Sequence, residues 1–366
     1  MPGLKLFVSN RLEILVKKLA EEFQTPLSAP LKKEVIVVQS KGMERWISME
    51  LARYHGICAN YRFPFPNTMI DEIFRVFFPD LVEYSPFQPR VMTWKIMKHL
   101  LDCLRQPGFE TLHAYVGSEH DSLKCYQIAE RIAHTFDQYL VFRPEMILDW
   151  EKGKDNHWQA LLWRMLIRDE RKPHRTALRE DFFKKIRTHK QEINNLPERI
   201  SVFGISSLPP FHMEVFAALS KIIPINLFFM NPCQEYWGDI VSDREARRLE
   251  RKLARKTISG ETLYLEKGNS LLASWGTLGK QFFDLVYNFD HEDQECFEES
   301  TRNDLLSFIQ SDILTLRERG PEKKQSIAQT DTSLEIHSCH SLMREVEVLH
   351  DSLLAMFEDL PEAGEV

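Results

Sequence analysis

The sequence predicts an α/β fold in which a parallel sheet is interrupted by a large all-helical insertion. Two short runs, Val35–Val38 and Ile225–Met230, are apolar apart from Asn226 and do not alternate with polar residues, which is typical of parallel strands buried on both faces. Strand and helix patterns alternate over the first 55 residues, and such a βαβα opening favours a parallel sheet. Between Asp71 and about Lys190 only helical periodicity is found, so two sheet halves are expected to flank a helical block.

The first strand and helix are expected at the amino terminus. Leu4–Val8 reads as a strand, and Asn10 with Glu13 three residues later resembles a capping box. The helix that follows has its apolar residues at helical spacing, at Leu12, Leu15, Val16, Leu19 and Phe23.

The second strand and helix, Val35 to Leu51, are the setting in which nucleotide-binding proteins place a phosphate loop. We expect a turn at Lys41 and Gly42, then a helix that stops at Gly56. A phosphate loop also needs a second glycine and a Lys-Ser/Thr pair, and neither is present here. The sequence therefore predicts a sheet of nucleotide-binding type without a nucleotide site, and no cofactor.

A proline-rich loop follows. Pro64 and Pro66 are expected to exclude helix and to hold Phe63 and Phe65 extended. Rings on a stiff loop can stack on nucleic-acid bases, or they can pack into the core, and the sequence leaves both readings open.

The helical block contains several amphipathic stripes, and the sheet resumes after it. Arg199–Ile205 and Ile225–Met230 are both expected to be strands that end in small polar residues, at the sheet edge where doubly wound folds bind ligands. Within the helical block, one predicted helix has the apolar stripe Val91, Trp94, Met97, Leu101 and Leu104. After the block, helices are predicted at His212–Lys221, Ser270–Phe289 and Asp304–Leu316.

The last part of the sequence reads as a charged linker and the start of another α/β domain. Residues 318–332 are polar and charged. Leu334–Ser338 is expected to be a strand and Met343–Phe357 a helix. One strand and one helix cannot bury a core alone, so we interpret this part as the truncated start of a second domain.

Composition and charge restrict the function classes. The six cysteines form no C-x-x-C pair, which argues against a disulfide framework or a structural zinc and suits a reducing cytoplasm. No segment approaches the roughly 20 apolar residues of a membrane span. Residues 281–366 hold 6 Lys or Arg against 20 Asp or Glu, which leaves 41 against 34 for residues 1–280. The basic part fits a channel for phosphates, or equally a solvated helical surface.

No catalytic constellation emerges. Three Glu-x-Lys triplets, at residues 170–172, 250–252 and 322–324, lie in mixed-charge runs and do not follow apolar strands. His337, Cys339 and His340 would point to different faces of a strand, which disfavours zinc. Ser206-Ser207 lacks the elbow of a hydrolase nucleophile.

Eight segments, spread in order along the chain, together resemble the amino-terminal part of the RecC family, the gamma subunit of exodeoxyribonuclease V. They are Val8–Leu12, Val38–Trp46, Phe63–Pro66, Phe136–Pro144, Gly204–Pro210, Asn231–Asp239, Leu271–Gly276 and Arg344–Asp351.

The resemblance implies a degenerate superfamily 1 helicase-like core that has lost its phosphate loop. It implies a 1A-like core domain at residues 1–70 and 198–317, a 1B-like helical insertion at 71–197, a linker at 318–332 and a 2A-like start at 333–366. It also implies a non-catalytic, cytoplasmic bacterial subunit that works with RecB-like and RecD-like subunits on broken duplex ends. Such a subunit carries the unwound 3′-ended strand and scans it for the Chi recombination signal. The alternatives are a scaffold without sequence readout, or an active ATPase or nuclease.

The resemblance further implies which residues would contact DNA. Some match the better-known family pattern, namely Gln39, Asp137, Gln138, Arg143 and Arg175. Others depart from it, and several of these replace neutral groups with charged ones. The sequence therefore does not tell which DNA sequence would be recognised as the Chi signal. The departing residues are Lys41, Arg45, Phe65, Asp71, His134 and Thr135.

Overall fold

A computed structural model describes residues 3–81, 85–117, 121–168, 170, 173–188, 195–254, 268–320, 322 and 324–359. The chain divides into two compact units. The first contains the residues up to Asn231 together with Ser274–Glu298, and the second contains Pro232–Ala273 together with the residues from Glu299 onward. The two units are described separately below.

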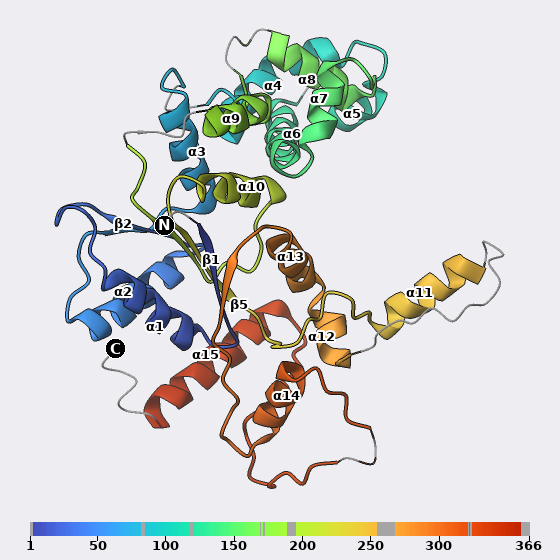
Figure 1. Cartoon of the computed structure of the whole chain (residues 1–366). Coiled ribbons are helices and arrows are strands. Elements are labelled where there is room, and N and C mark those ends of the chain that lie inside the picture. Colours follow the sequence, from blue (N-terminus) through green and yellow to red (C-terminus); the bar gives the residue numbers. More distant parts are fainter. Residues whose placement is uncertain are drawn as a thin grey trace. The chain divides into compact units, whose positions relative to one another are not determined.

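The first unit contains a six-stranded sheet in which every described pairing is parallel. The α/β class predicted from the sequence is therefore confirmed. The strand order is β3-β2-β4-β5-β1-β6 (Figure 1). The strands are β1 (Leu4–Ser9), β2 (Glu34–Val37), β3 (Tyr61–Arg62), β4 (Ile200–Phe203), β5 (Ile225–Met230) and β6 (Glu292–Glu295).

The helices of the first unit fall into those that cover the sheet and those of the helical block. The helices that cover the sheet are α1 (Leu12–Phe23), α2 (Lys41–His55), α10 (Pro210–Leu219) and α13 (Thr277–Tyr287). Those between β3 and β4 are α3 (Pro66–Phe77), α4 (Pro89–Cys103), α5 (Glu110–Val116), α6 (Ser122–Phe142), α7 (Pro144–Glu151), α8 (Trp158–Arg168) and α9 (Arg175–Thr188).

Helices cover both faces of the sheet. On one face, α1 and α2 pack over the rings of Phe7 and Phe228, which stack with centroids 4.6 Å apart. On the other face, Phe229 of β5 meets Phe282 of α13 edge to face at 5.4 Å, and α10 contacts both β5 and α13. The central strands are thus buried on both sides, which explains their continuous apolar sequence.

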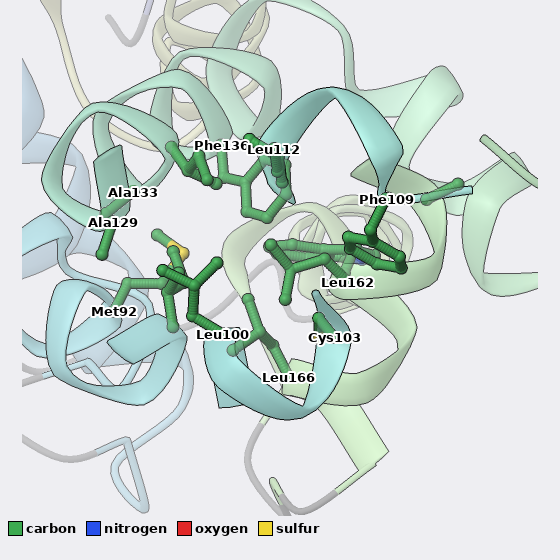
Figure 2. Packing of buried hydrophobic residues seen from close by; sticks show 14 of the residues in the cluster. Met92, Leu100, Cys103, Phe109, Leu112, Ala129, Ala133, Phe136, Leu162 and Leu166 are labelled. Atoms are coloured by element: carbon green, nitrogen blue, oxygen red, sulfur yellow. The ribbon is translucent and has the colours of Figure 1, made fainter. Parts of the chain in front are cut away.

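The helical block has a hydrophobic core of its own, built from α4, α5, α6, α7 and α8 (Figure 2). No strand interrupts residues 66–188 in the described part of the chain. The predicted stripe of α4 is confirmed only in part. Leu104, at the end of the helix, is buried and Met97 packs against the core, but Trp94 is 62% exposed and Leu101 is 43% exposed. The rest of the core side of α4 is formed by Met92, Ile96, Leu100 and Cys103.

Two predicted local features of this unit and its flanks are wrong, and one strand was missed. Helix α1 begins after Arg11 without a side-chain cap, because the Asn10 amide pairs with the backbone of Glu298 instead, at 2.8 and 3.0 Å. The predicted helix Ser270–Phe289 is interrupted at Gly276. β6 was not predicted, since the sequence Glu-Asp-Gln-Glu contains no strand-forming residue.

The second unit contains α11 (Asp243–Ala254), most of α12 (Ser270–Trp275), α14 (Leu305–Leu314) and α15 (Leu342–Asp359). Asp304 caps α14 by accepting a hydrogen bond from the Ser307 backbone. The expected strand Leu334–Ser338 is wrong, because these residues pair with no strand. In both units, none of the described helices is long and apolar enough to span a membrane.

Candidate nucleic-acid interface

The connection between β2 and α2 is shorter than the sequence suggested. Only Val38, Gln39 and Ser40 separate the strand from the helix. The Ser40 hydroxyl accepts a hydrogen bond from the Met43 backbone at 3.1 Å and caps the helix. The predicted turn at Lys41 and Gly42 is wrong, because both residues belong to the first helical turn. Such a short connection leaves no loop that could wrap around a phosphate.

The helix that starts there ends as predicted. Gly56 adopts the left-handed conformation, with φ of 78°, directly after His55. A glycine at this position carries no penalty for positive φ.

Gln39 lies at the carboxyl edge of the sheet, where ligands bind in doubly wound folds. It is exposed, and its side-chain amide donates a hydrogen bond to the Ser207 carbonyl at 3.0 Å. Ser207 follows β4, the neighbour of β2 in the sheet. The contact holds the Gln39 nitrogen, and its side-chain oxygen can still accept hydrogen bonds.

Two exposed cations stand in the first turns of α2, Lys41 and Arg45. Lys41 forms an ion pair with Glu44 at 2.7 Å, and its ammonium lies 5.8 Å from the centre of the Phe65 ring. A helix amino terminus carries partial positive charge, so cations at this end add to the field rather than offset it. Glu44 offsets one of the two cations, so the group keeps a positive charge that the helix end reinforces.

The two aromatic residues of the proline-rich loop have different roles. Phe63 packs against the core beneath α1 and α2, whereas Phe65 is 39% exposed and beside Lys41. The prediction that Pro66 excludes helix is wrong. Pro66 is the first residue of α3, a position that proline tolerates. Phe65 is extended as predicted, with φ of −74° and ψ of 155°.

Asp71 lies within α3 and is half-buried. Its backbone carbonyl accepts a hydrogen bond from the Arg75 side chain at 3.2 Å.

A second group of predicted residues lies on α6. His134 and Gln138 are four residues apart and both exposed, so they share one helix face, and Thr135 and Asp137 flank them half-buried. The Thr135 hydroxyl donates to the Arg131 carbonyl one turn earlier at 2.8 Å. The opposite face of α6 packs into the core of the helical block.

Arg143 and Arg175 lie at helix boundaries. Arg143 separates α6 from α7, is exposed, and its guanidinium lies 6.0 Å from the Tyr139 ring centre. Arg175 begins α9, and its side chain lies outside the described residues. The structure therefore places Gln39, Lys41, Arg45 and Phe65 around the start of α2, and His134, Thr135, Asp137, Gln138 and Arg143 along α6 and at its end.

The other chemical motifs gain no support as sites. The described residues contain no group of His, Cys, Asp and Glu that could hold a metal ion, and His337 pairs instead with Glu335 at 3.4 Å. All three Glu-x-Lys triplets include residues whose side chains lie outside the described part, although Glu170 itself pairs with Lys95.

Sequence reasoning missed some neighbours of these groups. Ser207 and Glu44 contact predicted residues, but nothing in their sequence context marks them. Trp94 lies near the α6 group, but the sequence does not indicate that it is exposed, because both stripes of α4 are apolar.

Comparison with known proteins shows the family to which the chain belongs. The family model described as "RecC, N-terminal domain" matches residues 4–316. The chain belongs to the RecC family. It is 34% identical to the RecBCD enzyme subunit RecC of Escherichia coli K12, over 98% of the chain and 36% of that relative. It is 35% identical to the RecC subunit of Haemophilus influenzae Rd, over 97% of the chain and 37% of the relative, and 28% identical to that of Mycolicibacterium smegmatis, over 98% and 32%.

The chain thus spans about a third of the length of these RecC relatives. Both groups of predicted residues lie within the part that the RecC family model matches.

Proposed function

We propose that this chain is a non-catalytic, DNA-contacting part of a RecC-type subunit. In this proposal it acts in the bacterial cytoplasm with RecB-like and RecD-like subunits on broken duplex ends. It contacts the unwound 3′-ended strand and takes part in scanning that strand for a Chi signal. The relatives carry the name RecBCD enzyme subunit RecC, which supports the partners and the complex.

The observation that carries the proposal is the start of α2. A helicase-like core would hold ATP at this strand-to-helix connection, but here three residues join β2 to α2 and no phosphate loop fits. The same place instead presents Gln39, Lys41, Arg45 and the Phe65 ring. An amide, two cations and an exposed ring are the groups that bind a single strand through base edges, phosphates and stacking.

The domain assignment is part of the same proposal. We propose a 1A-like core at residues 1–70 and 198–317, a 1B-like insertion at 71–197, a linker at 318–332 and a 2A-like start at 333–366. The separate hydrophobic core of α4 to α8 supports the insertion.

Two measurements on the purified chain test the proposal. Fluorescence anisotropy should show binding to labelled single-stranded DNA that weakens as salt rises. An ATPase assay with and without DNA should show no hydrolysis above background. ATP turnover by the chain, or no DNA binding at low salt, would refute the proposal.

Variants tested in the complete complex distinguish Chi scanning from a purely structural role. Gln39→Ala, Asp137→Ala and Arg143→Ala should leave assembly with the partner subunits intact and reduce the response to Chi. A scaffold without sequence readout would keep both assembly and response.

A further inference from the structure

A groove lies between α4 and α6 in the helical block, outside the group at the start of α2. Its volume is about 500 Å³. Arg90 and Trp94 of α4 line one side, and Tyr126, Glu130 and His134 of α6 line the other. α4 and α6 pack closely through a shared core, so the groove has firm walls.

The groove contains an aromatic pair that the core does not use. Trp94 is 62% exposed, and its ring lies 5.7 Å from that of Tyr126 at an angle of 53°. Because Met92 and Ile96 already fill the core side of α4, Trp94 is not required to anchor the helix. The exposed face of the indole offers a flat surface for another ring to stack on, and the tilted Tyr126 ring forms a wall beside it.

The polar groups of the groove fit the other parts of a nucleotide. Arg90 is exposed in the first turn of α4 and can pair with a phosphate. Glu130 and His134 are one helical turn apart on α6, and both are exposed. A carboxylate accepts hydrogen bonds from exocyclic base amines such as that of cytosine.

We propose that this groove is a base-binding subsite for single-stranded DNA. One base stacks on the exposed Trp94 ring, with the tilted Tyr126 ring at the edge of that base, and the neighbouring phosphate pairs with Arg90. The inference rests on the proposed function and extends it. His134 belongs both to the groove and to the exposed face of α6. A DNA strand bound along that face of α6 would therefore reach the groove and Trp94 on the neighbouring α4.

The test compares a normal strand with one that lacks bases. Anisotropy titrations of the whole chain would use labelled oligo(dC) and an abasic oligomer of the same length and charge. Trp94→Ala should weaken oligo(dC) binding about 10-fold, the size expected when one stacked base is lost. It should leave binding of the abasic oligomer unchanged, and Trp94→Phe should restore most of the affinity.

Tyr115→Ala provides the matched control, because Tyr115 is also an exposed aromatic residue of the helical block, at 52%, but lies outside the groove. This variant should bind oligo(dC) as the unmodified chain does. Circular dichroism of each variant checks that the helices remain folded.

Three results would overturn the subsite. The first is unchanged oligo(dC) binding by Trp94→Ala, which would show that no base stacks on Trp94. The second is an equal loss with the abasic oligomer, which would show that bases are not bound there. The third is no binding of either strand by the unmodified chain, which would refute the proposed function as well.

Discussion

Removing the two cations at the start of α2 should change how strongly DNA binding depends on salt. Lys41 and Arg45 are exposed on the first turns of α2, and Arg143 is exposed at the end of α6. Each phosphate contact on a single strand contributes about −0.7 to the slope of log affinity against log salt concentration. If each of these three residues contacts one phosphate, together they contribute about −2 to the slope. The double variant Lys41→Ala/Arg45→Ala removes two of these contacts and should make the slope less steep by about 1.4.

That difference is large enough to measure. Between 50 and 200 mM salt, three contacts predict an affinity loss of about 20-fold, and one remaining contact predicts about 3-fold. The ion pair between Lys41 and Glu44 does not prevent this, because an exposed pair stabilises the fold by only about 0–1 kcal/mol and a phosphate can replace the carboxylate. Anisotropy titrations with labelled oligo(dT) at four salt concentrations would give both slopes.

A matched control is available in the helical block. Lys154 is exposed and forms an ion pair with Asp149 at 2.7 Å, as Lys41 does with Glu44, but it is not among the predicted DNA contacts. Lys154→Ala should leave the slope unchanged. If the Lys41 and Arg45 double variant has the slope of the unmodified chain, then the start of α2 does not contact phosphate, and the reasoning about this end of the helix is wrong.

Three further predictions concern the fold that carries these groups. Phe136→Ala should lower the free energy of unfolding by about 3–5 kcal/mol in urea denaturation, because the ring is fully buried and meets Trp163 edge to face at 5.4 Å. Gly56→Ala should cost about 1 kcal/mol in the same assay, since φ of 78° is strained for any side chain, and an equal stability would contradict this. Burial by itself would raise the pKa of Glu151, but hydrogen bonds from His174 and Trp163 hold that pKa below its usual 4.5. The stability it provides is therefore present above about pH 4.5 and is lost as pH falls through the lowered pKa, so Glu151→Gln should flatten the acid side of a pH-dependent melting series.

The sequence predicted the sheet well where strands are fully buried. Val35–Val38 and Ile225–Met230 are apolar apart from Asn226, without alternation, and both runs form central strands apart from the last residue of the first. β6 could not be found in this way, because an edge strand is formed by its backbone pairing with β1 and its residues are largely exposed. The reverse holds for Leu334–Ser338, whose sequence suits a strand but which has no partner strand in the described part of the chain.

The local geometry of the candidate site could not be predicted from the sequence. The residues of Ser40–Met43 lack the second glycine and the Lys-Ser/Thr pair of a phosphate loop, which the sequence shows directly. The helix start at Lys41 was not predicted, because Gly42 suggested a turn, while the Ser40 cap starts the helix directly after the strand. The contact between Gln39 and Ser207 joins residues 168 positions apart, and only the pairing of β2 with β4 brings them together.

The exposed face of α4 differs from the prediction at Trp94, which lines the groove between α4 and α6. Both stripes of this helix are apolar, so periodicity alone gives no reason to prefer Met92 and Ile96 over Trp94 and Leu101 for the core. The structure buries the first pair, and Trp94 then remains as a large exposed ring next to the α6 face that carries His134. Burying a tryptophan would be favourable by several kcal/mol in any packed helix pair. A fold that leaves this ring exposed beside a groove therefore forgoes that stabilisation, which is expected when the ring serves to bind a partner such as a DNA base.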